Sequence, residues 1–252
     1  MKRSFFILIL GVLAASSAVS TGRDSGNRVP VLLELFTSEG CSSCPPADRL
    51  LELLDQKQPV AGANAIVLSE HVDYWDNGGW KDPFSSAEFT SRQKEYARQF
   101  GLDGVYTPQL VVDGQAQLVG GNDTQAREAI GKAARRPKTP VDIVLVDQQA
   151  AKLSVRVGVS SVGGRDATVF VALAQKHADS QVGRGENSGR HLRHVAVVRS
   201  LVMAGTAKAG TAFSQQVILS IPPGAGKGGL RIVAFVQERA SGRVLGATQL
   251  EF

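Results

Sequence analysis

Residues 34–46 read Glu-Leu-Phe-Thr-Ser-Glu-Gly-Cys-Ser-Ser-Cys-Pro-Pro. The apolar run at 31–36, broken only by Glu34, predicts a central strand buried on both faces. Apolar positions between 47 and 54 recur at helical spacing, and the prolines at 45 and 46 stand where a first helical turn tolerates them. The stretch therefore predicts a strand, a turn and a helix, with Cys41 and Cys44 at the start of the helix.

Cys41 and Cys44 are the two cysteines of the chain. A structural disulfide usually closes a long loop, because its stabilisation grows with loop length, so a bridge between residues three apart contributes little. We therefore interpret the pair as reactive. The unpaired amides and dipole of a helix start favour an anion, which makes Cys41 the expected nucleophile and Cys44 the resolving thiol. Beyond this redox-active disulfide we expect no cofactor.

The amino-terminal residues 1–20 have the pattern of a secretory signal peptide. Lys2 and Arg3 precede an apolar run at 5–15, and small residues follow it. Because that run is shorter than the roughly 20 residues of a spanning helix, we expect a periplasmic or secreted protein with no membrane span after signal cleavage. The formal net charge of +5 is mild and its basic residues are scattered among acids. Nucleic acid is therefore not an expected partner.

Strands and helices are predicted to alternate along the first half of the chain. Beyond the opening stretch, strands are predicted at 65–68, 109–112 and 115–119, and helices at 87–100 and 122–134. A basic, proline-bearing stretch at 135–140 predicts a linker. After it, six segments favour strands separated by Gly, Pro and Ser: 141–146, 153–159, 168–174, 194–203, 213–221 and 230–237. The predicted boundaries are a signal peptide over 1–20, an α/β domain over 30–136 and a β-sandwich-like all-β domain over 140–252.

The order of elements resembles the thioredoxin-like superfamily. Together with His-Val-Asp-Tyr-Trp-Asp at 71–76 and Tyr-Thr-Pro at 106–108, the opening stretch is similar to a family of secreted bacterial proteins, a domain of unknown function within that superfamily. The similarity extends to Gly-Glu-Asn-Ser-Gly-Arg at 185–190, within a glycine-rich stretch predicted to be a loop. The resemblance implies an α/β thioredoxin-like fold for the first domain. It also implies a thiol-disulfide oxidoreductase acting on cysteine-containing exported proteins or a redox partner protein.

Five further side chains become candidates through the resemblance. It implies that Pro108 is a cis-proline opposite the cysteines and that Thr107 binds substrate backbone. Glu34 resembles the buried acid that takes up the resolving cysteine's proton in some members, since burial raises a carboxyl pKa toward the range for proton transfer. A solvent-facing Glu34 is an equal alternative. His71 and Trp75 follow the second strand, on the side where α/β folds place ligands, and are candidates for a substrate groove or for packing an insertion.

Two other functions stay open on the sequence. One is a non-catalytic binding module, and the other is a soft-metal carrier for copper or zinc that uses both cysteines and His71. Only two thiols are present, and Met203 is the one thioether outside the leader, so we predict no metal site. The dipeptide Ser42-Ser43 between the cysteines leaves reductant, oxidant and isomerase open.

Overall fold

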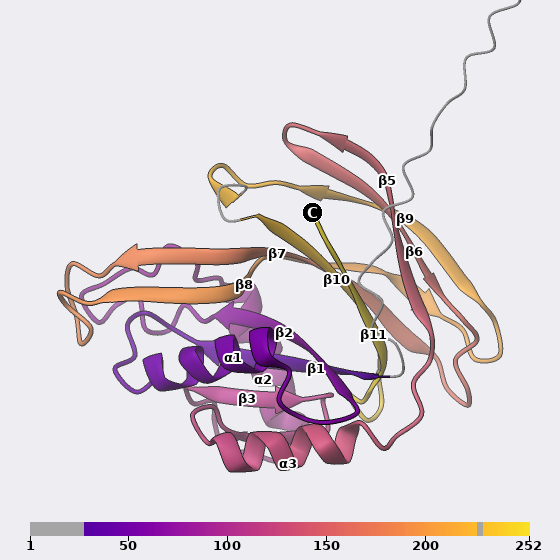
Figure 1. The fold of residues 1–252 in the computed structure, drawn as a ribbon, viewed down its shortest axis with the longest axis horizontal. Helices are drawn as coiled ribbons and strands as arrows, with labels where there is room; N and C mark the ends of the chain where they lie inside the picture. Colours follow the sequence, from indigo (N-terminus) through magenta and orange to yellow (C-terminus); the bar gives the residue numbers. More distant parts are fainter. Residues whose placement is uncertain (1–27, 226–228) are drawn as a thin grey trace, which may run out of the picture.

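The computed structural model describes residues 28–225 and 229–252, so the predicted signal peptide over 1–20 lies outside the described residues. Within these ranges it has three helices, α1 (Pro45–Lys57), α2 (Ala87–Gln99) and α3 (Asp123–Ala133) (Figure 1). The same ranges hold eleven strands: β1 (Val29–Thr37), β2 (Ala63–His71), β3 (Gln109–Val112), β4 (Ala116–Val119), β5 (Val141–Gln149), β6 (Lys152–Val159), β7 (Ala167–Gln181), β8 (His191–Ala207), β9 (Phe213–Ser220), β10 (Leu230–Glu238) and β11 (Val244–Glu251). None of the described helices has the length and apolar character needed to span a membrane.

Eight strands form one mixed sheet in the order β11-β10-β7-β8-β2-β1-β3-β4. β1 runs parallel to β2 and antiparallel to β3, and β8 joins β2 where Ser69 pairs with Val197 in parallel. β5, β6 and β9 form a separate antiparallel sheet. The inner side chains of this small sheet share one apolar core with β7 and β10 of the large sheet (Figure 1).

The predicted fold class is wrong. An α/β thioredoxin-like domain followed by a separate β-sandwich-like all-β domain was expected, but β7, β8, β10 and β11 continue the sheet that holds β1 to β4. The described structure is also mostly strand rather than rich in helix. The physical reason is that apolar patterning predicts where a strand lies but not which strand it pairs with, and the pair of Ser69 with Val197 joins distant parts of the chain.

The two faces of β1 contact different helices. Thr37 Oγ1 donates to Asp48 Oδ1 of α1 at 2.9 Å, whereas Glu34 accepts from Arg92 and Tyr96 of α2. Because successive strand side chains point to opposite faces, Thr37 and Glu34 lie on opposite sides of the sheet. The helix that carries the cysteines therefore packs on the side of β1 that Glu34 does not face.

Arg92 is the centre of a buried cluster between α2 and the sheet. Its Nε donates to Glu34 Oε1 at 2.5 Å, and its guanidinium carbon lies 5.1–5.2 Å from three aromatic ring centres, those of Tyr96, Phe170 and Phe235. Glu70 Oε1 lies 3.8 Å from the same Nε, and neither oxygen of Glu70 has a hydrogen-bond partner. Burial, reinforced by the neighbouring Glu34, raises the pKa of Glu70 well above its usual range.

Replacing Glu70 by glutamine is expected to stabilise the protein at alkaline pH and to change little near pH 5. A carboxyl group whose pKa is raised on folding stabilises the folded state below its unfolded pKa, and this contribution is lost as pH rises through the folded pKa. Urea unfolding should give Glu70→Gln a gain of about 1 kcal/mol or more at pH 8. The exposed Glu128→Gln should show no such gain. An equal difference at both pH values would contradict the expectation.

Candidate functional site

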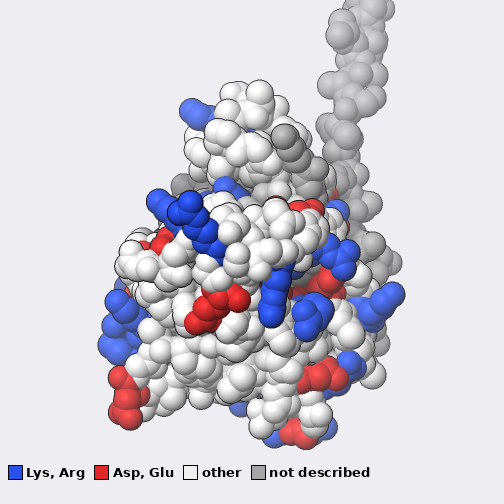
Figure 2. Space-filling model, turned by 90° about the vertical axis from the view of Figure 1, so that its left-hand side faces the viewer, with Lys and Arg blue, Asp and Glu red and all other residues white. Residues whose placement is uncertain are grey.

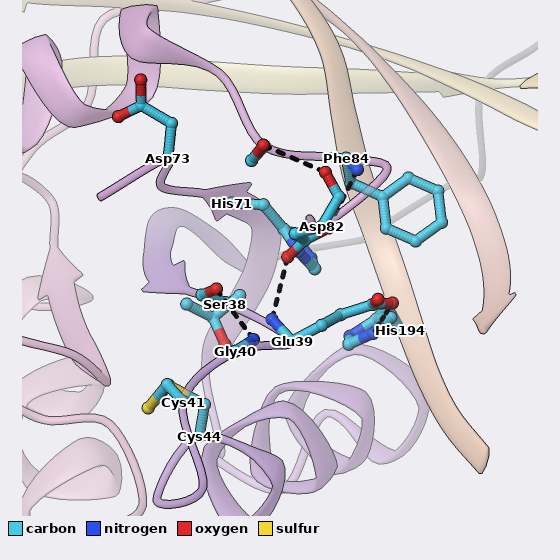
Figure 3. Close-up of polar contacts among 12 residues, drawn as sticks. Ser38, Glu39, Gly40, Cys41, Cys44, His71, Asp73, Asp82, Phe84 and His194 are labelled. Carbon is cyan, nitrogen blue, oxygen red and sulfur yellow. Dashed lines mark hydrogen bonds and ion pairs between the residues drawn. A yellow bond between two sulfur atoms is a disulfide. The ribbon is translucent and has the colours of Figure 1, made fainter. Parts of the chain in front are cut away.

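Cys41 and Cys44 form a disulfide at the amino end of α1, with their Cα atoms 5.4 Å apart (Figure 3). Cys44 is the N-cap residue of α1, and Cys41 lies in the turn after β1. Both cysteines are fully buried, whereas the intervening Ser42 and Ser43 are exposed. The predicted order of strand, turn, cysteine pair and helix is confirmed.

Trp75 and Thr107 lie beside the turn that carries Cys41. A Cβ atom added to Gly40 would lie 3.0 Å from Trp75 Cβ, so glycine permits this close approach. Trp75 Nε1 donates to Thr107 Oγ1 at 2.8 Å, and the peptide bond from Thr107 to Pro108 is cis, as predicted. Trp75 thus lies against the cysteine turn, Thr107 bonds to Trp75, and Pro108 is buried beside Thr107.

His71 and Glu34 lie away from this surface. His71 is fully buried, and its Nδ1 is 2.7 Å from Asp82 Oδ2. Burial alone would lower the pKa of His71, but the Asp82 carboxylate outweighs it and raises the pKa. Burial likewise opposes ionisation of Asp82, but His71 outweighs it and lowers the pKa of Asp82. The two groups therefore form a buried ion pair, and Glu34 stays engaged with α2 on the opposite face of the sheet.

A network of buried polar side chains lies next to the disulfide (Figure 3). Glu39, two residues before Cys41, accepts from Trp80 Nε1 at 2.8 Å, and its other oxygen lies 3.2 Å from His194 Nε2 of β8. The backbone N–H of Glu39 donates to Asp82 at 2.8 Å. The turn is thereby fixed to β8 and to the segment after β2.

Asp48 is the buried acid on the helix that carries the cysteines. It stands four residues after Cys44, one helical turn away, and accepts a hydrogen bond from Thr37. Burial raises the pKa of Asp48, against the lowering influence of His194. His194 Nδ1 lies 3.8 Å from Asp48 Oδ2 and has no hydrogen-bond partner. Sequence reasoning missed this acid, although its spacing from Cys44 could have indicated it.

The loop between β7 and β8, residues 182–190, covers the cysteine turn, and we name it the cap loop. Asn187 is fully buried, and its side-chain amide donates to the backbone carbonyls of Glu39 at 2.8 Å and Cys41 at 2.9 Å. Glu186 accepts from the backbone N–H of Ser42 at 3.0 Å. The sequence indicated a loop here but not its position, because only the sheet order, in which β8 lies between β7 and β2, brings the loop to the cysteine turn.

The described residues hold no group of three or more His, Cys, Asp or Glu side chains arranged to bind a metal ion. A cavity of about 460 Å³ lies between β4 and α3, away from the cysteines, and Lys132 and Arg136 are among its lining residues. At the cysteine turn the structure brings together the disulfide and the buried acids Glu39 and Asp48.

Fold and site together define a mostly β-sheet protein with a large mixed sheet and a buried C-x-x-C disulfide beneath a loop between two strands of that sheet. The chain belongs to the family described as "Protein of unknown function (DUF1223)", whose model matches residues 32–237. This confirms the predicted family of unknown function.

Two solved structures and the curated proteins complete the comparison. Protein AGR_C_4864 from Agrobacterium tumefaciens is 28% identical with a TM-score of 0.69, over 88% of this chain and 94% of that one. The sporulation control protein Spo0M from Bacillus subtilis is 11% identical with a TM-score of 0.33, over 46% of this chain and 49% of that one. No curated protein matches the chain.

Proposed function

We propose that the chain is an exported thiol-disulfide oxidoreductase that exchanges disulfides with cysteine-containing proteins outside the cytoplasm. The observation that carries this proposal is the closed Cys41–Cys44 disulfide at the amino end of α1. So short a bridge adds little stability, whereas a helix start lowers the pKa of a thiol. The signal-peptide pattern at 1–20 supports export, and disulfides persist outside the cytoplasm.

The reaction proceeds in two balanced steps. The Cys41 thiolate attacks one sulfur of a partner disulfide, which forms a mixed disulfide and releases the partner's other sulfur as a thiolate. Cys44 then gives up its proton and attacks Cys41 Sγ, which closes the protein disulfide and releases the partner's second sulfur. The partner leaves with both sulfurs reduced, one as a thiolate and one as the thiol that takes the proton of Cys44. Two electrons pass from the cysteine pair to the partner, and the reverse sequence oxidises a partner dithiol.

Asp48 is the residue we assign to the proton of Cys44. It is on the same helix, is buried, and has a raised pKa, which suits a carboxylate that accepts and returns a proton. Glu34, the acid expected from the sequence, lies on the opposite face of the sheet with both oxygens bound by Arg92 and Tyr96. The geometry therefore favours Asp48.

Trp75, which lies against the cysteine turn, and its hydrogen-bond partner Thr107 are the proposed contact for partner protein, with the cis-proline Pro108 next to them in the chain. Trp75 and Thr107 are half-buried and present a mixed apolar and polar surface. Figure 2 shows one end of the molecule, where Lys and Arg are interspersed with Asp and Glu among many uncharged residues. Such a surface suits a protein partner better than a polyanion.

The test is the redox equilibrium of the purified protein in glutathione buffers, read by thiol trapping, with Cys41→Ala as the control. A reversible two-electron transition with a fast-reacting thiol at neutral pH supports exchange, and the midpoint distinguishes a reductant from an oxidant. An inert pair would instead favour a binding module. Thiols protected only by added copper or zinc would favour a metal carrier.

A further inference from the structure

Glu186 places an exposed carboxylate at the cysteine turn. Its Oε2 accepts a hydrogen bond of 3.0 Å from the backbone N–H of Ser42, the residue after Cys41. Hydrogen bonding to Ser42, by its side chain and by its backbone N–H, lowers the pKa of Glu186, so the side chain is ionised at neutral pH. A negative charge therefore lies at the backbone of the residue that follows Cys41, whose sulfur attacks in the proposed reaction.

The negative charge of Glu186 opposes the stabilisation that the amino end of α1 gives to a Cys41 thiolate. Unpaired amides near the amino end of a helix stabilise a nearby anion, and this effect is what makes Cys41 reactive. Glu186 engages one amide of this turn and adds a charge of the same sign as a thiolate. Both effects disfavour the thiolate of Cys41 and favour the closed disulfide. In the other direction, Ser43 Oγ lies 3.3 Å from Cys41 Sγ and is able to donate to a thiolate.

The position of Glu186 is fixed by its neighbours in the cap loop. The side-chain amide of Asn187, the next residue, donates to the carbonyls of Glu39 and Cys41. Its Oδ1 accepts a hydrogen bond of 3.0 Å from Arg190. A Cβ atom added to Gly183 would lie 3.3 Å from the ring of Trp80, so the loop also packs closely on that side chain. The carboxylate is thus held at the turn by a loop with several anchors.

We propose that Glu186 is a positioning residue that restrains Cys41, keeping it in the less reactive thiol or disulfide form and so setting the redox poise of the pair. This inference rests on the proposed function. On the buried side of the turn, Glu39 pairs with His194, Asp48 lies near His194, and His71 pairs with Asp82, while the exposed cation Arg190 of the cap loop donates to Asn187. Glu186 is the carboxylate that hydrogen-bonds the segment between the cysteines.

The test compares Glu186→Gln with Asp147→Asn, a matched loss of one exposed negative charge on the separate small sheet. The Cys41 pKa is measured in a Cys44→Ser background from thiolate absorbance against pH, and the redox equilibrium in the full-length protein with both cysteines. Glu186→Gln should increase the thiolate fraction near neutral pH by about threefold, the scale of an exposed charge pair. It should also shift the glutathione equilibrium toward the dithiol, and 0.5 M salt should reduce both effects.

The outcomes separate the two proposals. If the wild-type protein shows no reversible exchange, the proposed function fails. If it exchanges normally and Glu186→Gln leaves both the pKa and the equilibrium unchanged, only the role of Glu186 is overturned. An increase that Asp147→Asn reproduces, or that salt leaves intact, would show a general charge or structural effect and would also overturn it.

Discussion

Replacing Cys44 by serine is expected to leave partner proteins covalently attached to Cys41. Without the resolving thiol, the mixed disulfide formed in the first step cannot close to the Cys41–Cys44 bridge, so the complex accumulates. Cys41→Ser removes the proposed nucleophile, and attachment should fall by roughly 100-fold or more. The measurement is non-reducing electrophoresis of the exported fraction from cells that express each variant.

The pair of cysteine variants also identifies the attacking sulfur. Both side chains are fully buried in the disulfide form, so exposure does not distinguish them. We assign Cys41 as the attacking residue because it precedes the helix and because the Ser43 hydroxyl lies 3.3 Å from its sulfur. Attachment through Cys44 in the Cys41→Ser variant would reverse the two roles, and attachment in neither variant would count against exchange.

Replacing Arg92 by methionine is expected to lower the free energy of unfolding by about 3–5 kcal/mol, the cost of leaving a buried charge without its partner. Arg92 is the cation that faces Glu34 and Glu70, and both carboxyl groups are buried. Methionine keeps much of the apolar length of the side chain, so the loss of charge dominates. Urea unfolding at neutral pH measures the change.

A control and a partial rescue accompany this prediction. Arg98→Met, at an exposed position of the same helix, should change stability by less than about 0.5 kcal/mol. Adding Glu34→Gln to Arg92→Met should recover part of the loss, because it removes the buried carboxylate that Arg92→Met leaves without its cation. Equal effects of the two arginine variants would show that the buried cluster does not stabilise the fold.

Local sequence signals predicted most elements but not their assembly. The cysteine turn, α1, α2 and α3 lie where helical spacing, prolines and N-cap residues placed them. β11 was missed, and β7 and β8 extend beyond their predicted ends. The long-range pairing of Ser69 with Val197 had no sequence signal, since alternating side chains are compatible with several neighbours.

The same distinction applies to the candidate site. Cys41, Cys44 and Pro108 were recognisable from short motifs that act locally. Glu34 was a candidate proton acceptor through the family resemblance, with a solvent-facing side chain as the equal alternative, but the alternation of β1 buries it against α2. Asn187 and His194 come from the cap loop and β8, so their approach to the turn follows from the sheet order and from no local pattern.

The position of β8 between β7 and β2 determines when the site can form in a growing chain. The segment with the cysteines emerges early, whereas Asn187 and His194 emerge about 150 residues later. Until then the carbonyls of Glu39 and Cys41 lack their hydrogen bonds from Asn187. The edge of β2 that later pairs with β8 is also open, and an open strand edge is a template for unwanted pairing. A chain shortened before β7 would therefore display an uncovered cysteine pair and an unpaired strand, and studies of the site need the later strands present.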